Sequence, residues 1–202
     1  NTKEVSEAID SVGGEFNAFT GKEYAGYYVK VSYDSIEIAC DVLSDMLLNS
    51  KFAQEEIDKE RGVILEEYNM YQDTPTYQIG WDFEHLVFGD QPLGWDQIGT
   101  KELITSVMHD DFVKYKHELY TPDNIVVVMA GHVDHKSAAE LVGKYFSMEE
   151  SKRKYDFDAL LNKDGGDVNL TEKKTEQAHV AVGFPSYPEG HKDHWGVKLL
   201  SV

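Results

Sequence analysis

The chain has 202 residues, 41% hydrophobic and 12% aromatic, so it can bury a sizeable core and is not expected to be disordered. Its 19 Lys and Arg residues stand against 37 Asp and Glu residues, a formal net charge of −18 at pH 7. This charge repels a phosphate backbone and makes nucleic acid a poor candidate partner. A cationic peptide fits the charge better, but solubility alone is the favoured explanation of it. No apolar run approaches the roughly 20 residues of a membrane span, and no secretory leader is recognisable.

Apolar periodicity, turn residues and helix caps divide the chain into helical and extended stretches. In the first half of the chain these signals predict a helix over 2–12, an extended segment over 15–20, a strand over 23–33, helices over 35–50, 54–72 and 77–89, and a loop over 90–100. In the second half they predict one or two short helices within 101–120, a buried strand over 125–130 and a helix over 136–145. A linker over 148–176, a strand over 178–187 and a helix from 191 onward follow.

This order predicts an α+β fold with a layered, antiparallel-rich sheet packed with helices. We expect a first domain over 1–147, a linker over 148–176 and the start of a second domain over 177–202. The single cysteine, Cys40, forms no internal disulfide. A reducing compartment is therefore favoured, the cytoplasm first and an organelle matrix second, unless disulfides are simply not needed there.

Two glutamates in the helix over 54–72 occupy unexpected positions. Ile57, Glu60, Ile64, Glu67 and Tyr71 recur at spacings of three and four, the stripe that faces a core. Glu60 and Glu67 lie two turns apart and project from nearly the same side. Buried carboxylates need a counter-charge or a metal, so this stripe borders solvent, meets an arginine from another element such as Arg153, or supports a metal.

Histidine would be the natural companion ligand for zinc. His132 and His135, like His191 and His194, are spaced by three residues, but neither pair carries the glutamate that a catalytic zinc helix needs. His85 lies in an aromatic-rich helix and is interpreted as a packed residue. From these residues alone, no histidine pair can be assigned to a zinc site with Glu67.

The segment GGEFNAFTGKEYAGYYVKV is unusually aromatic for one hairpin. Its aromatic side chains, which include Phe16, Phe19 and Tyr24, can belong to the core. They can also flank an edge strand that binds an extended peptide through its backbone.

Four segments in order resemble landmarks of one enzyme family: GGEFNAFTGKEYAGYYVKV, ERGVILEEYNMYQDTP, FGDQPLGWDQIGT and YTPDNIVVVMAGHVD. They are similar to the inverted-motif zinc peptidases, the group of pitrilysin, insulysin and mitochondrial processing peptidase, and most similar to the bacterial processing-protease-like members. The resemblance covers essentially the whole chain, and it implies a half-domain of the peptidase fold that is truncated at both ends.

Family members bind zinc through the two histidines of an H-x-x-E-H helix and a distant glutamate on a helix carrying E-x6-E. The resemblance implies that Glu67 is the zinc ligand and that Glu60 is an acid behind it that orients a ligand. It also implies that Asn17, Ala18 and Phe19 form a strand edge that pairs with substrate. The H-x-x-E-H motif and its general-base glutamate are absent from this sequence, and the family spacing places them about a dozen residues before Asn1.

The resemblance therefore implies part of a zinc-dependent endopeptidase acting on peptides or unfolded segments, with Zn²⁺ in the intact parent and an inactive fragment here. Its partners would be a peptide substrate, in particular a cationic one, and a second homologous domain or a homodimer mate. The first alternative is a non-catalytic peptide-binding or assembly subunit of the same fold. The second is an interaction domain in which Glu60 and Glu67 meet an arginine, either Arg61 or Arg153.

Overall fold

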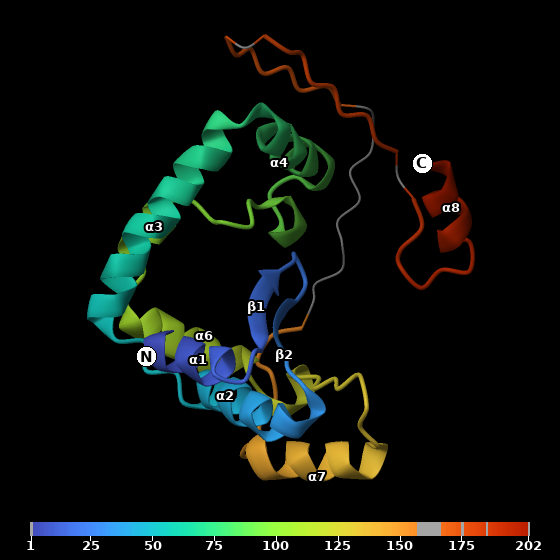
Figure 1. Ribbon diagram of the computed structural model, residues 1–202. Helices are drawn as coiled ribbons and strands as arrows, with labels where there is room; N and C mark the ends of the chain where they lie inside the picture. Colours follow the sequence, from blue (N-terminus) through green and yellow to red (C-terminus); the bar gives the residue numbers. More distant parts are fainter. Residues whose placement is uncertain (1, 157–166, 175, 185, 202) are drawn as a thin grey trace.

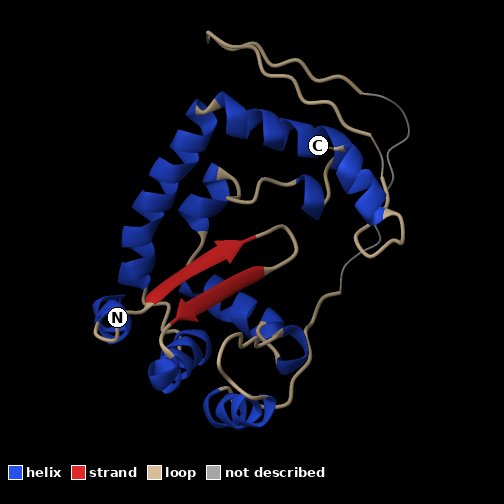
Figure 2. Ribbon diagram, turned by 45° about the vertical axis from the view of Figure 1, so that its right-hand side comes forward, coloured by secondary structure: helices blue, strands red, loops and turns tan. Residues whose placement is uncertain are grey.

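The computed structural model describes residues 2–156, 167–174, 176–184 and 186–201, and it has the predicted α+β character (Figures 1 and 2). Among these residues the one sheet is a two-stranded antiparallel hairpin, and no helix is long and apolar enough to cross a membrane. The elements in chain order are α1 Thr2–Asp10, β1 Glu15–Thr20, β2 Ala25–Lys30, α2 Ile36–Leu48, α3 Gln54–Asp73, α4 Pro75–Phe88, α5 Lys101–Ser106, α6 His109–Leu119, α7 His135–Tyr145 and α8 His194–Leu200.

The hairpin β1–β2 forms where the sequence is rich in aromatic and β-branched residues, which favour strands. Residues 15–20 pair with residues 25–30 in continuous antiparallel register. The Gly21 amide closes the turn by donating to the Tyr24 carbonyl at 2.7 Å. Figure 2 shows this hairpin surrounded by the helices. Helices α1 and α2 contact its strands.

The core lies where α2 packs against α1, α7 and β2 (Figure 1). Ile9 of α1 is 0% exposed and Cys40 of α2 is 4% exposed. Burial of this cysteine raises the pKa of its thiol, so the group stays protonated and packs as a small apolar side chain. At the rim, Glu37 of α2 accepts hydrogen bonds from Lys144 and Tyr145 of α7, both at 3.0 Å.

Helix α3 is positioned by α4 and α5, the two helices that pack against it. The Arg61 guanidinium reaches the end of α5 and donates to the carbonyls of Ile104 and Val107, the latter at 2.8 Å. These carbonyls lack partners within their own short helix, so the cation satisfies them. The helix ends before the Thr74–Pro75 pair because a residue before proline avoids the helical conformation, and Pro75 begins α4 where its missing N–H costs nothing.

The two strands predicted over 125–130 and 178–187 are not formed, and residue 185 of the second lies outside the described residues. Along 125–130 the side chains still alternate as in a strand, with Val126 at 85% and Val128 at 79% exposure between half-buried neighbours. A cavity of about 440 Å³ is lined both by this segment and by residues 29–33. Among the described residues, no ladder forms between the two segments.

The C-terminal part follows an extended path before its last helix. Residues 167–174 run beside the junction of α3 and α4, where the Lys173 ammonium donates to the Gln72 carbonyl at 2.5 Å and to the Gln78 side chain at 3.2 Å. Farther on, α8 confirms the helix predicted from 191 onward. The predicted linker over 148–176 includes ten residues, 157–166, and residue 175 that lie outside the described residues.

The start of α7 predicts a pH-dependent contribution to stability. Asp134 caps this helix by accepting from the amides of Lys136 and Ser137 at 3.0 and 3.1 Å. Hydrogen bonds from Ser137 hold the pKa of this carboxyl below its ordinary value. Its contribution is therefore fully present above the unfolded pKa of about 3.9 and is lost as pH falls through the lower folded pKa.

We expect Asp134→Ala to lower the thermal midpoint at neutral pH, and this difference from wild type should shrink as the pH falls below about 3.9. Asp134→Asn should keep most of the cap, because asparagine caps helices as well as aspartate does. Thermal unfolding of the three proteins from pH 7 to pH 3 checks this. An alanine variant as stable as wild type at neutral pH would contradict it.

Candidate functional site

Helix α3 carries the two glutamates that the sequence singles out. Seven residues of an α-helix bring Glu60 and Glu67 within about 20° of each other around the axis. In the structure Glu60 is exposed and Glu67 is half-buried. The half-buried face of α3 is centred on other residues, Ile57, Arg61, Ile64, Leu65 and Tyr68. The two glutamates therefore lie along one border of the packed face. The apolar spacing had indicated its centre, and that interpretation is wrong.

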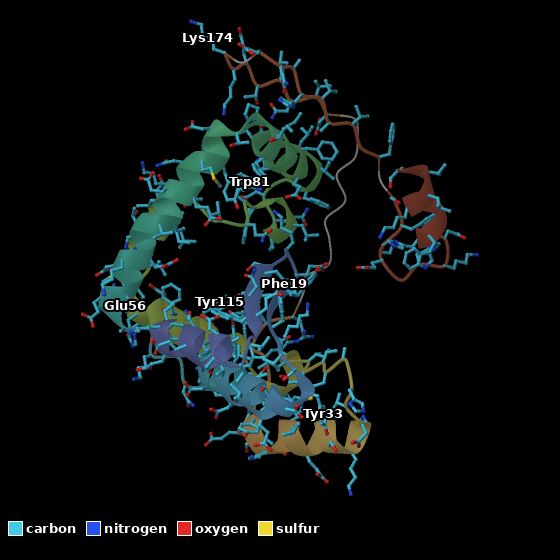
Figure 3. All side chains as sticks on the ribbon, viewed as in Figure 1. Phe19, Tyr33, Glu56, Trp81, Tyr115 and Lys174 are labelled. Carbon is cyan, nitrogen blue, oxygen red and sulfur yellow. The ribbon has the colours of Figure 1, made fainter. Side chains whose placement is uncertain are left out.

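The Glu67 carboxylate is held by a tyrosine one turn farther along α3. The Tyr71 hydroxyl donates to Oε1 of Glu67 at 2.9 Å. This hydrogen bond is the main cause that raises the pKa of Tyr71, so the phenol remains a donor at neutral pH. The Tyr71 ring packs edge-on against Tyr77 and Trp81 of α4, with centroid separations of 5.0 and 5.1 Å. Trp81 is labelled in Figure 3, where α4 lies beside the end of α3.

Neither glutamate forms an ion pair with an arginine. Arg61 is engaged with the end of α5 and with Asp58 of its own helix at 3.2 Å. Arg153 pairs with Asp156 at 2.6 Å. The arrangement expected of a plain interaction domain, in which an arginine neutralises Glu60 or Glu67, is therefore not present among the described residues.

The predicted substrate edge, Asn17 to Phe19, lies on β1 as expected from the sequence. All three side chains are exposed, and among the described residues β1 pairs along one edge only, with β2. The Asn17 side chain accepts from the Ala18 amide at 2.8 Å. The Phe19 ring covers Gly26 on the neighbouring strand so closely that a Cβ there would collide with it. Phe19, labelled in Figure 3, thus belongs to the exposed surface of the hairpin.

The turn of the hairpin is tied to α4 and to the loop that follows it. The Lys22 ammonium pairs with the Glu84 carboxylate at 2.8 Å and also donates to the Trp95 carbonyl. The Gln97 side chain donates to the Thr20 carbonyl at the end of β1. These contacts fix the strand edge relative to the α3–α4 pair. The sequence assigns no role to Lys22, Glu84 or Gln97, because a single sequence does not show which distant side chains meet.

The same region holds a half-buried carboxyl, Asp96. Burial is the main cause that raises its pKa, and the neighbouring Lys22 ammonium opposes this effect. Asp96 follows Trp95 directly, beside the carbonyl that Lys22 binds. The Lys22–Glu84 ion pair joins the hairpin turn to α4 beside this carboxyl.

The histidine pairs do not build a metal site within the described residues. His132 packs against Tyr33 with a centroid separation of 5.1 Å, and His191 stacks on Tyr187 at 4.1 Å. No three His, Cys, Asp or Glu side chains in the described part of the chain are grouped to hold a metal. Glu67 itself suits a zinc ligand, because its carboxylate carries an outer hydrogen bond of the kind that orients metal-binding groups. The described residues can thus supply one ligand of the set that zinc requires.

Comparison with family models covers most of the sequence. Residues 1–88 match the model for the insulinase family, peptidase family M16, and residues 106–202 match the model for the M16 inactive domain. The chain belongs to peptidase family M16. The sequence-based assignment to the insulysin group is thereby confirmed, and the first match contains both β1 and the E-x6-E segment of α3.

Curated M16 relatives are about twice as long as this chain. It is 37% identical over 202 residues to a Bacillus subtilis protein named as an uncharacterized zinc protease, YmxG, covering 100% of this chain and 49% of that one. An uncharacterized zinc protease of Streptomyces coelicolor is 36% identical over 206 residues, with 98% and 45% covered. The chain thus spans about half the length of the curated relatives that it matches.

Solved structures share the fold of this chain. A protease from Helicobacter pylori superposes with a TM-score of 0.66 at 25% identity, covering 79% of this chain and 38% of that chain. An M16 inactive domain from Pseudomonas fluorescens gives a TM-score of 0.73 at 12% identity, covering 80% and 40%, which supports the fold alone. The roles assigned to Glu60, Glu67 and residues 17–19, and the domain limits at 147 and 176, stay predictions.

Proposed function

We propose that this M16 chain is part of a zinc-dependent endopeptidase in which Glu67 supplies a carboxylate ligand. The observation that carries the proposal is the state of Glu67: half-buried on α3, bound by a phenol and not by an arginine. A carboxylate in this setting is prepared for a cation. Glu60 lies on the same side of the helix one E-x6-E interval earlier and would orient the ligand set from behind.

Bound zinc would polarise the scissile carbonyl and lower the pKa of a water molecule to about 7. In this proposal Glu67 would hold the ion on α3 as one of its ligands. The two histidine ligands and the general-base glutamate would come from an H-x-x-E-H segment, which this sequence does not contain. We therefore assign no proton transfer to a residue of this chain.

Substrate would bind along β1 as an added strand. The exposed residues Asn17, Ala18 and Phe19 follow the strand edge that β2 leaves free. Backbone pairing of this kind gives affinity without strict sequence preference, while neighbouring side-chain pockets add specificity. Binding as an added strand requires peptides that are short or unfolded. The net charge of −18 favours cationic ones among them. A second homologous domain or a homodimer mate would cover the substrate. The single buried cysteine supports a cytoplasmic location.

A non-catalytic subunit of the same fold is the second candidate. It is favoured by the match of residues 106–202 to the M16 inactive domain. The residues that precede this sequence in its parent discriminate between the two: an intact H-x-x-E-H motif supports the peptidase, and a degenerate one supports a peptide-binding or assembly role.

The proposal predicts that the 202-residue chain alone binds zinc weakly and does not cleave peptides. The full-length protein is expected to bind zinc tightly and to cleave peptides. The reason is that one carboxylate cannot complete a four-coordinate site. Zinc affinity by chelator competition and hydrolysis of an unfolded cationic peptide, measured on both proteins, test it. Zinc-dependent hydrolysis by the 202-residue chain would contradict the prediction, and a full-length protein without zinc-dependent hydrolysis would remove the enzyme proposal.

A further inference from the structure

The hydrogen bond between Tyr71 and Glu67 makes the two carboxylate oxygens unequal. Oε1 accepts a hydrogen bond from the Tyr71 hydroxyl at 2.9 Å, and no hydrogen bond or ion pair among the described residues engages Oε2. An oxygen that already accepts a strong hydrogen bond is a poorer partner for a cation than its neighbour. The structure thus marks Oε2 as the oxygen available to an ion.

The Tyr71 ring is held by a second element and cannot turn freely with its own helix. Tyr77 and Trp81 approach it edge-on from α4, at interplanar angles of 74° and 65°. Edge-to-face contacts of this kind each stabilise the pair beyond simple burial. The break at Thr74–Pro75 folds α4 back against α3 and brings both rings to Tyr71. Packing by α4 therefore sets the position of the phenol oxygen, and through it the rotamer of Glu67.

We propose that Tyr71 is the positioning residue of Glu67: its hydroxyl fixes one carboxylate oxygen and thereby orients the other for a zinc ion. This inference rests on the proposed function, in which Glu67 is a zinc ligand. It gives a role to Tyr71, which the sequence places on the same helical face as Glu67. A ligand whose orientation is set before the ion arrives binds it more tightly than one that must lose rotamer freedom first.

The test is the zinc affinity of full-length Tyr71→Phe, measured by competition with a chromophoric chelator. Phenylalanine keeps the ring between Tyr77 and Trp81 and removes only the hydroxyl. We expect the zinc dissociation constant to rise about 10- to 100-fold, as for other outer partners of metal ligands, while the thermal midpoint of the metal-free protein is unchanged. Tyr77→Phe is the matched control, because its hydroxyl makes no hydrogen bond to Glu67 in the described structure, and its zinc affinity should equal that of wild type.

Glu67→Gln and the double variant Glu67→Gln/Tyr71→Phe separate this inference from the proposed function. If the hydroxyl acts through the carboxylate, the double variant binds zinc no more weakly than Glu67→Gln alone. Unchanged affinity in Tyr71→Phe, with weakened binding in Glu67→Gln, would overturn the positioning role and leave the ligand in place. Unchanged affinity in Glu67→Gln would remove the ligand itself, and the positioning role with it.

Discussion

Replacing Glu67 by glutamine in the full-length protein is expected to weaken zinc binding by more than about 100-fold, because loss of an outer partner alone costs 10- to 100-fold. Peptide hydrolysis should fall with it, since the zinc site would lose its carboxylate. Glutamine keeps the size of the side chain and the acceptor for Tyr71 but removes the negative charge. The measurements are zinc affinity by chelator competition and the rate of peptide hydrolysis at saturating zinc.

Glu66→Gln is the matched control for this variant. Glu66 is the neighbouring glutamate of α3, it is exposed, and it is turned away from the Glu60–Glu67 side of the helix. The Glu66→Gln variant should bind zinc as wild type does. Glu60→Gln should fall between the two, with a loss of about 10- to 100-fold. Equal losses in the Glu66 and Glu67 variants would show that general acidity of α3, and not one ligand, governs binding.

The largest effect on stability is expected at Ile9. This side chain of α1 is 0% exposed and is one of only four core hydrophobic residues in the described part of the chain, where it packs close to Gly14. Ile9→Ala should lower the free energy of unfolding by about 2–5 kcal/mol, through lost burial and the cavity left behind. Urea unfolding of the 202-residue chain, followed by circular dichroism, measures it.

Two further substitutions bracket that measurement. Ile9→Val removes one methyl group and should cost about 0.5–1.5 kcal/mol. Val126→Ala changes a side chain that is 85% exposed and should change the free energy of unfolding by less than about 0.5 kcal/mol. If Ile9→Ala were as mild as Val126→Ala, the junction of α1 and α2 would not be the core of this chain.

The helices were predictable because each is specified by its own sequence. The pattern over 54–72 predicts α3, observed as Gln54–Asp73, and Thr74–Pro75 marks its end. The same kind of local signal predicted a strand over 125–130, and that strand does not form. Its alternation is present in the structure, but a strand also needs a neighbour at ladder distance, and a cavity lies between this segment and residues 29–33. Local pattern specifies a conformation, and pairing depends on what lies beside it.

The candidate site shows the same division between local and distant information. The E-x6-E spacing was readable, and so was the common side of α3 that it implies. The unequal burial of Glu60 and Glu67 was not, because it depends on where α4 and α5 pack. Tyr71 was visible in the stripe, but its hydrogen bond depends on a rotamer that rings from α4 select. The contact of Lys22 with Glu84 joins residues far apart in sequence and leaves no periodic signal.

The unpaired segment over 125–130 has a consequence for handling the protein. Val126 and Val128 present apolar side chains to solvent at 85% and 79% exposure, beside extended backbone that no neighbouring strand pairs among the described residues. Such an edge is a template for strands of other molecules, and it promotes aggregation at high concentration. The charge of −18 opposes this by mutual repulsion between chains. Because salt screens that repulsion over about 10 Å at 0.1 M, concentrated samples of this chain should stay dispersed best at low ionic strength.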